Sequence, residues 1–166
     1  CEQTWEGGIK RKVAIKRIRK DYTATERFKK FFLREARILS ILNHPSVVQF
    51  YDFGVIEGSY YILMEYIDGI SLSDIIRAKK LYNIETPIGI AISIIITICK
   101  GLDYLHGKKL EDGRDAAIIH RDVNPQNILI SFKGNIKLVD FGIAKDATRE
   151  SNITKNGIKG KLYYMP

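Results

Sequence analysis

Three oxygen-bearing side chains, Asp122, Asn127 and Asp140, are spaced so that together they could hold a cation and accept a proton. Asn127 lies seven residues before Gly134 and Asp140 lies six residues after it. A hairpin turn centred on this glycine brings both residues to the same open end of two strands. One carboxylate and one amide, supplemented by water and phosphate oxygens, suit Mg²⁺. Asp122, five residues before Asn127, could approach the same point and accept the proton of a hydroxyl group.

Glu35 is the second unusual residue, because the helix predicted around it carries apolar residues on the same face. At 100° per residue, five apolar side chains lie within about 60° of it, namely Phe28, Phe31, Phe32, Leu39 and Leu42. An isolated glutamate of this kind more often reaches solvent at the helix edge. If it is buried, it needs a cation partner, because an unpaired buried charge is costly. Lys16, on the preceding strand, is the predicted partner.

The periodicity of the chain predicts the elements that must position these residues. It predicts strands at 11–19, 47–53, 60–66, 128–132 and 136–139, and helices at 23–42, 72–80 and 87–107. From Gly142 onward the chain is polar, which predicts a long loop. This order of elements predicts an α+β fold with a small sheet-based lobe, a mainly helical second lobe and a hinge near residues 66–69.

Positive charge is concentrated in the first quarter of the chain. The 166 residues carry a net charge of +8, and residues 1–37 account for 12 basic and 5 acidic side chains. Seven of the residues at 10–20 are basic, so a nucleic-acid-binding module is one alternative to a solvated strand face beside a phosphate site. The two cysteines are too far apart for a Cys-x-x-Cys site and favour a reducing compartment. The longest apolar stretch, 88–99, is shorter than the roughly twenty residues that span a bilayer and is predicted to be a core helix.

The motifs together resemble the protein kinase family, and in particular the bacterial relatives of the eukaryotic-type Ser/Thr kinases. The run Val-Ala-Ile-Lys that ends at Lys16 is similar to the strand whose lysine holds the α- and β-phosphates of ATP, and Glu35 matches the helix glutamate that pairs with this lysine. The run His-Arg-Asp-Val-Asn-Pro-Gln-Asn that ends at Asn127 is similar to the catalytic loop. The resemblance implies that Asp122 is the catalytic base and that Asn127 and Asp140 are Mg²⁺ ligands.

The resemblance extends over almost the whole chain and also implies a nucleotide site. It implies that Met64 is the gatekeeper behind the adenine and that the backbone of Glu65 and Ile67 makes the hinge contacts. Ala14 and Leu129 would sandwich the adenine ring. The cofactors implied by this set of residues are ATP and Mg²⁺.

The family architecture implied by the resemblance is a two-lobe protein-kinase-like fold that is truncated at both ends. Residues 1–66 would form the N-terminal lobe, a small antiparallel sheet with one helix, and residues 67–166 a partial, mainly helical C-terminal lobe. The Gly-rich loop that covers the phosphates is missing before the lysine strand, and the chain stops within the activation segment. We therefore expect the isolated chain to be inactive. Candidate phosphorylation sites in that segment are Thr148, Ser151 and Thr154.

Two residues depart from the family pattern. Asn124 stands where Ser/Thr kinases usually carry a lysine beside the γ-phosphate, and Lys161 stands where they usually carry a threonine that contacts the catalytic aspartate. The resemblance implies an ATP-dependent kinase that phosphorylates Ser and Thr hydroxyls of proteins. The alternative is a nucleotide-binding pseudokinase or scaffold without turnover.

The predicted setting follows from the same resemblance. We expect a cytoplasmic kinase segment with protein substrates, among them a second copy of the same protein in trans-autophosphorylation. No specific nucleic-acid partner is expected, and this segment indicates no membrane attachment.

Overall fold

The computed structural model describes residues 1–17 and 26–141, without the side chains of residues 27, 28 and 31, and forms two compact units. Among the described residues, the first unit comprises Cys1–Leu42, Gln49–Tyr66 and Phe141, and the second comprises Asn43–Val48 and Ile67–Asp140. The chain passes from the first unit to the second after Tyr66, where the sequence places the lobe boundary. Residues 43–48, which the sequence analysis assigns to the N-terminal lobe, group with the second unit.

Backbone hydrogen bonds explain why residues 43–48 belong to the second unit. Val47 forms a parallel bridge with Leu138, and the Val48 N–H donates to the Leu138 carbonyl at 2.9 Å. The Leu138 N–H in turn donates to the Ser46 carbonyl at 2.8 Å. The strand predicted at 47–53 therefore begins only at Phe50, because the backbone of Val47 and Val48 already pairs with another strand.

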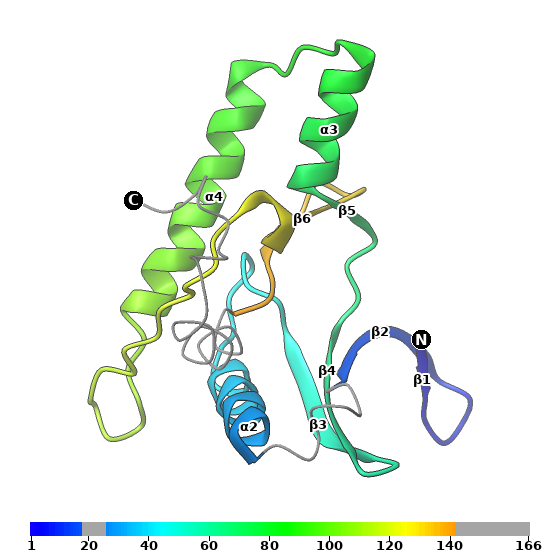
Figure 1. Ribbon diagram of the computed structural model, residues 1–166, viewed down its shortest axis with the longest axis vertical. Helices are drawn as coiled ribbons and strands as arrows, with labels where there is room; N and C mark the ends of the chain where they lie inside the picture. The colour runs from blue at the N-terminus through cyan, green and yellow to red at the C-terminus, as the bar shows by residue number, and fades with distance from the viewer. Residues whose placement is uncertain (18–25, 142–166) are drawn as a thin grey trace, which may run out of the picture. The chain divides into compact units, whose positions relative to one another are not determined.

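The first unit contains a four-stranded antiparallel sheet with the strand order β1-β2-β4-β3 (Figure 1). The strands are β1 (Glu2–Thr4), β2 (Lys10–Arg17), β3 (Phe50–Ile56) and β4 (Ser59–Glu65). Helix α2 (Glu26–Ser40) packs against β3 and buries Phe32, Ala36 and Leu39. The capping box predicted at Thr23 lies outside the described residues.

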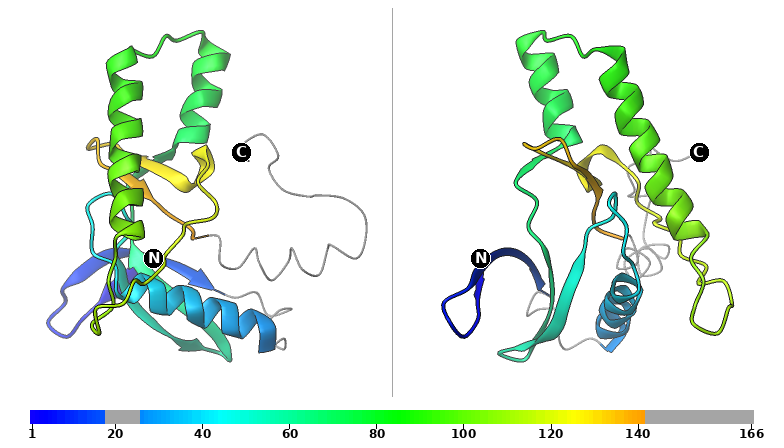
Figure 2. Two further views of the ribbon diagram at one scale, coloured as in Figure 1. Left: turned by 90° about the vertical axis from the view of Figure 1, so that its left-hand side faces the viewer. Right: turned by 180° about the vertical axis from the view of Figure 1, so that it is seen from behind.

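The second unit contains two helices and a three-stranded antiparallel sheet with the order β5-β6-β7. Its elements are β5 (Gly69–Ser71), α3 (Leu72–Tyr82), α4 (Ile88–His106), the 3-10 helix η1 (Pro125–Asn127), β6 (Ile128–Ser131) and β7 (Ile136–Leu138). Helices α3 and α4 lie side by side (Figure 2). The core between α4 and the sheet is formed by Ile98, Ile128 and Leu138. The α+β class is confirmed, and the short strands β1 and β5 are additions that the sequence pattern did not predict.

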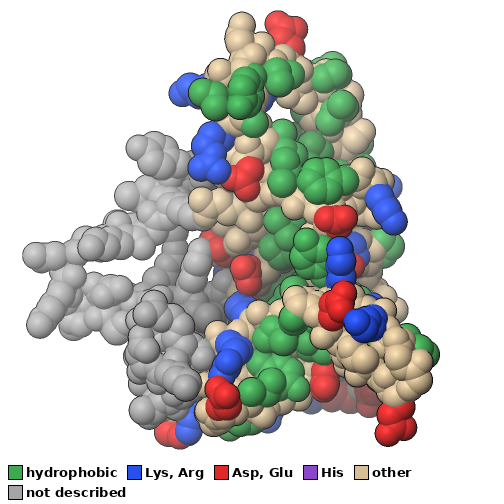
Figure 3. Space-filling view, turned by 90° about the vertical axis from the view of Figure 1, so that its right-hand side faces the viewer, with side chains coloured by type: hydrophobic (Ala, Val, Ile, Leu, Met, Phe, Trp, Pro, Cys, Tyr) green, Lys and Arg blue, Asp and Glu red, His purple; other side chains and the backbone are tan. Residues whose placement is uncertain are grey.

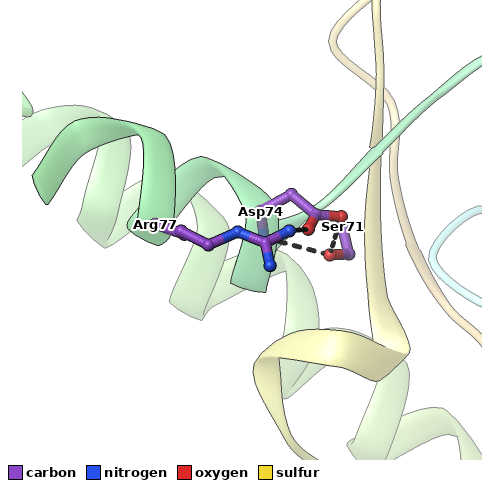
Figure 4. Close-up of polar contacts among 3 residues, drawn as sticks. All are labelled: Ser71, Asp74 and Arg77. Atoms are coloured by element: carbon purple, nitrogen blue, oxygen red, sulfur yellow. Dashed lines mark hydrogen bonds and ion pairs between the residues drawn. The ribbon is translucent and has the colours of Figure 1, made fainter. Parts of the chain in front are cut away.

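Helix α3 begins with a polar cap (Figure 4). The Asp74 N–H donates to the Ser71 Oγ at 3.1 Å, and this hydroxyl donates to the Asp74 carboxylate at 2.6 Å. Arg77, one turn further on, forms an ion pair with the same carboxylate. Because the first turn of a helix lacks internal partners for its N–H groups, this cap defines where β5 ends and α3 begins.

Helix α4 buries only part of its surface among the described residues. Ile98, Gly101 and Leu105 are buried, whereas Ile88, Ile92 and Ile95 are exposed. Hydrophobic side chains also gather at the end of the unit where α3 and α4 are joined (Figure 3), and they include Leu81, Tyr82 and Ile84. Helix α4, with 19 residues, is long and apolar enough to cross a membrane. This is weak evidence for a membrane span, because core helices of soluble proteins meet the same criteria. The predicted core helix thus has one covered face.

Candidate active site

Lys16 and Glu35 form an ion pair within the first unit. The Lys16 Nζ lies 2.5 Å from the Glu35 Oε1. The Glu35 side chain is 1% exposed, in a helix that also buries Leu39. The reading in which Glu35 reaches solvent is therefore wrong. Because an isolated buried carboxylate is costly, the ion pair fixes the place of the Lys16 ammonium group.

The residues predicted to surround adenine lie partly on the same sheet. Ala14 of β2 is directly opposite Met64 of β4, so Ala14, Lys16 and Met64 face the same side of the sheet. The Glu65 N–H donates to the Gln49 carbonyl at 2.9 Å. A hinge contact through the Glu65 backbone would consequently use its carbonyl oxygen.

The other two residues predicted at the nucleotide belong to the second unit. Ile67 directly follows the boundary between the units. Leu129 lies in the middle strand of the second sheet, paired with Ser71 on one side and Lys137 on the other. Their contacts with adenine remain predictions.

The predicted catalytic loop, residues 120–127, is held by side-chain amides in the second unit. The Asn127 Nδ2 donates to the Asp122 carboxylate at 2.5 Å and to the Asp122 carbonyl at 2.9 Å. Asn127 is buried, whereas Asp122 is partly exposed. The carboxylate that would accept a proton is thus fixed by a neutral donor and still reaches the surface.

Asp140 lies beside this loop through the register of the β6–β7 hairpin. The Val139 N–H donates to the Asn127 carbonyl at 3.0 Å, so Asn127 and the neighbour of Asp140 are backbone partners, as the spacing around Gly134 predicts. Asp140 is exposed and has a φ of 56°. A left-handed conformation is uncommon for a residue with a side chain and often occurs at functional positions.

The amide and carboxylate at this end of the hairpin suit a hard divalent cation. Because the Asn127 Nδ2 donates to Asp122, its Oδ1 lies on the opposite side of the amide group. This oxygen and the Asp140 carboxylate are the ligand types that Mg²⁺ prefers, with water and phosphate completing its shell. In the part of the chain that the structure describes, no group of three or more His, Cys, Asp or Glu residues could hold a metal.

His120 lies at the start of the predicted catalytic loop and is 1% exposed. Burial lowers the pKa of this imidazole below its ordinary value, although a backbone hydrogen bond involving Val139 and the nearby carboxylates of Asp122 and Asp140 oppose the shift. Desolvation is the largest of these effects, so burial favours the neutral imidazole. A neutral imidazole at this position adds no positive charge beside the carboxylates of Asp122 and Asp140.

One contribution to the loop was missed by the sequence reasoning. Asn124 was singled out only as a departure from the expected lysine, whereas its side chain binds the loop backbone on both sides. The signal available in the sequence was the Asn-Pro pair, which is typical of a capped turn. Lys161 and the candidate phosphorylation sites Thr148, Ser151 and Thr154 lie outside the described residues.

Comparison with known proteins identifies the family. The family model described as "Protein kinase domain" matches residues 3–166, and the chain belongs to this family. The fold and the ion pair of Lys16 with Glu35 agree with this assignment.

The curated relatives are bacterial kinases. The chain is 36% identical to the serine/threonine-protein kinase PrkC of Bacillus subtilis over 95% of its own length, and 38% identical to the serine/threonine-protein kinase PknB of Mycobacterium leprae over 95%. It is also 35% identical over 95% of its length to a Myxococcus xanthus relative named tyrosine-protein kinase MasK. The chain spans 22% of the length of PrkC and 24% of the length of both PknB and MasK.

A solved structure shows the same fold. The kinase domain of Mycobacterium tuberculosis PknI matches with a TM-score of 0.62 and 30% identity, over 79% of this chain and 49% of that chain. The chain therefore corresponds to about half of a solved kinase domain. The predicted family and the predicted kinase-like fold are both confirmed.

Proposed function

We propose that the protein transfers the γ-phosphate of ATP to serine and threonine hydroxyl groups of proteins. The observation that carries the proposal is the buried ion pair of Glu35 with Lys16, 2.5 Å between Nζ and Oε1. A lysine fixed in this way is suited to hold the α- and β-phosphates. Family membership and the relatives named serine/threonine-protein kinases give independent support.

The residues of the second unit have complementary roles in this proposal. Asn127 and Asp140 would hold Mg²⁺, which neutralises phosphate charge when it is bound. Asp122 would orient the acceptor hydroxyl and take its proton. The hydroxyl oxygen then bonds to the γ-phosphorus while the bond from this phosphorus to the β-phosphate oxygen breaks, which releases ADP. Most of the catalysis would come from positioning and electrostatics.

The acceptor class is part of the proposal and needs its own test. Two of the relatives are named serine/threonine kinases, while one is named a tyrosine kinase. Asn124 also stands in place of the lysine that is usual in Ser/Thr kinases, so the sequence pattern alone does not fix the acceptor class. We propose Ser and Thr as acceptors, with a second copy of the protein among the substrates. The same proposal places this segment in the cytoplasm, where ATP is supplied.

The isolated 166-residue chain is proposed to be inactive. It corresponds to 49% of the matched PknI kinase-domain chain, and helix α4 leaves much of its apolar surface exposed among the described residues. Phosphate transfer by the isolated chain would contradict this part of the proposal, but the roles assigned to the individual residues would still hold.

Intact-mass spectrometry of the full-length protein with Mg²⁺ and ATP tests the proposal, with Asp140→Asn as the inactive variant. Asp103→Asn, an exposed aspartate on α4, serves as the matched control. We expect additions of one phosphate each in the wild type and the control, and none in Asp140→Asn. Fragmentation then shows whether the phosphate is on Ser, Thr or Tyr. No addition to the protein or to added casein would favour the pseudokinase alternative.

A further inference from the structure

Asn124 has a buried side chain whose amide binds the catalytic loop on both sides. Its Oδ1 accepts from the Gln126 N–H at 3.0 Å, and its Nδ2 donates to the Asp122 carbonyl at 2.9 Å. The residue is 4% exposed and has the extended backbone of a helix N-cap, φ −157° and ψ 162°. The Asn124 side chain thus caps the 3-10 helix η1 and also binds the backbone of Asp122, two residues earlier.

Two asparagines converge on the same carbonyl oxygen. The Asp122 carbonyl accepts from Asn124 Nδ2 at 2.9 Å and from Asn127 Nδ2 at 2.9 Å, and Asn127 also donates to the Asp122 carboxylate. A carbonyl oxygen has two lone pairs, so both bonds can form together. We call this arrangement of Asn124, Asn127 and Asp122 the amide clamp. It restrains both the backbone and the side chain of Asp122.

The usual lysine could not make the same contacts as Asn124. An ammonium group only donates hydrogen bonds, whereas the cap of η1 requires an acceptor for the Gln126 N–H. A primary amide supplies a donor and an acceptor on one short, rigid side chain. The departure from the family pattern therefore exchanges a mobile cation for a fixed neutral contact within the loop.

We propose that Asn124 is a positioning residue of the kinase reaction, which acts through the amide clamp by fixing Asp122 for the acceptor hydroxyl. The inference rests on the proposed function. A residue that fixes the base governs turnover in the bound complex, because small misplacements of reacting groups are costly. We expect little effect on ATP affinity, since the amide contacts described above are with the loop.

The test distinguishes the two hydrogen bonds of the Asn124 side chain, the one that caps η1 and the one to the Asp122 carbonyl. Asn124→Asp keeps the acceptor for the Gln126 N–H but an ionised carboxylate donates nothing to the Asp122 carbonyl. Asn124→Ser tests the same separation without a charge, because its single hydroxyl oxygen can cap η1 but cannot occupy the Oδ1 and Nδ2 positions of the amide at once. Asn124→Lys restores the residue usual in the family. Asn135→Ser and Asn135→Asp, at an exposed position in the β6–β7 turn, are the matched controls.

Steady-state kinetics of the full-length protein with ATP, Mg²⁺ and casein give the main readout. We expect kcat to fall about tenfold or more in Asn124→Asp and Asn124→Ser, with KM for ATP changed less than about twofold and the Asn135 variants unaffected. Asn124→Lys should not raise kcat. Wild-type kcat in Asn124→Ser, or a gain in Asn124→Lys, would overturn the proposal. A loss confined to KM would also overturn it, because it would place Asn124 at the nucleotide.

Hydrogen exchange distinguishes failure of this inference from failure of the proposed function. In the same variants, backbone amides of residues 120–128 should exchange several-fold faster than in wild type, while the Asn135 variants keep wild-type rates there. If the wild type transfers no phosphate, the kinase proposal fails, and faster exchange would still support the amide clamp. Unchanged exchange in Asn124→Asp and Asn124→Ser would overturn the amide clamp whatever the activity.

Discussion

The Lys16 Nζ lies 2.5 Å from the Glu35 Oε1, and the two partners differ greatly in burial. The Lys16 side chain is 30% exposed, whereas Glu35 is 1% exposed. Loss of the lysine would leave a carboxylate in the interior without its cation, whereas loss of the glutamate would leave an ammonium group that can reach water. The two single substitutions should therefore have unequal effects on stability.

Lys16→Met should lower the free energy of unfolding of the complete kinase domain by about 3 kcal/mol, because it leaves the buried Glu35 charge without its ammonium partner. The double variant Lys16→Met with Glu35→Gln should recover much of this loss, since no buried charge then remains. Chemical denaturation measures both values, and Lys12→Met, at an exposed position of the same strand, is the control. A double variant no more stable than Lys16→Met would contradict the explanation.

Asp122→Asn should suppress turnover while leaving ATP affinity nearly unchanged. The substitution removes the proton acceptor, an effect of roughly 10²- to 10⁴-fold on kcat, and Asp122 is not among the residues assigned to ATP or Mg²⁺. Calorimetric titration with ATP and Mg²⁺ gives the affinity, and single-turnover kinetics give the rate. Asp103→Asn on α4 is the matched control. A large loss of ATP affinity in Asp122→Asn would assign that carboxylate to the nucleotide instead.

Much of the candidate site could be predicted because its residues follow from strand and helix periods. The helical wheel placed Glu35 on an apolar face, and the spacing around Gly134 placed Asn127 and Asp140 at one end of a hairpin. Both predictions depend on local geometry that a regular period fixes. The backbone bond between Val139 and Asn127 confirms the second.

The parts that could not be predicted depend on contacts between distant segments or on the direction of one side chain. Val47 and Val48 were predicted to start a strand that continues to Phe53, yet their backbone pairs with Leu138, about ninety residues away. The three-residue strand β5 shows no period, because it is too short to alternate. The Asn124 amide was recognisable as a departure, but spacing does not reveal which groups an amide binds.

Gly69→Ala should destabilise the second unit by about 1–3 kcal/mol. A Cβ at this position would lie 2.1 Å from the Ile130 carbonyl oxygen and 2.5 Å from the Ser131 Cα, so the β5–β6 pair would have to separate. Gly89→Ala is the matched control, because its Cβ meets nothing within 4 Å and alanine favours a helix by up to about 1 kcal/mol. Thermal unfolding of the two variants should therefore shift in opposite directions. Equal melting temperatures of the two variants would show that β5 can accommodate the added Cβ without losing its pairing with β6.

His120 should make the stability of the kinase domain depend on pH below about 6.5. Burial lowers the pKa of this imidazole in the folded protein, whereas the unfolded chain titrates near the ordinary value of about 6.5. Above that value both states are neutral, and the stability associated with the neutral buried ring is complete. As the pH falls below it, the unfolded chain binds a proton first, so unfolding becomes more favourable by up to about 1.4 kcal/mol per pH unit.

This linkage can be isolated by substitution. His120→Gln should flatten the decrease in unfolding free energy between about pH 6.5 and 5, because the group that binds the proton on unfolding is gone. His106→Gln, at the exposed end of α4, should retain the wild-type slope. Denaturant titrations at several pH values measure the slopes, which stay interpretable even if His120→Gln lowers the absolute stability. Equal slopes in wild type and His120→Gln would show that Asp122 and Asp140 hold the imidazole pKa near its ordinary value despite burial.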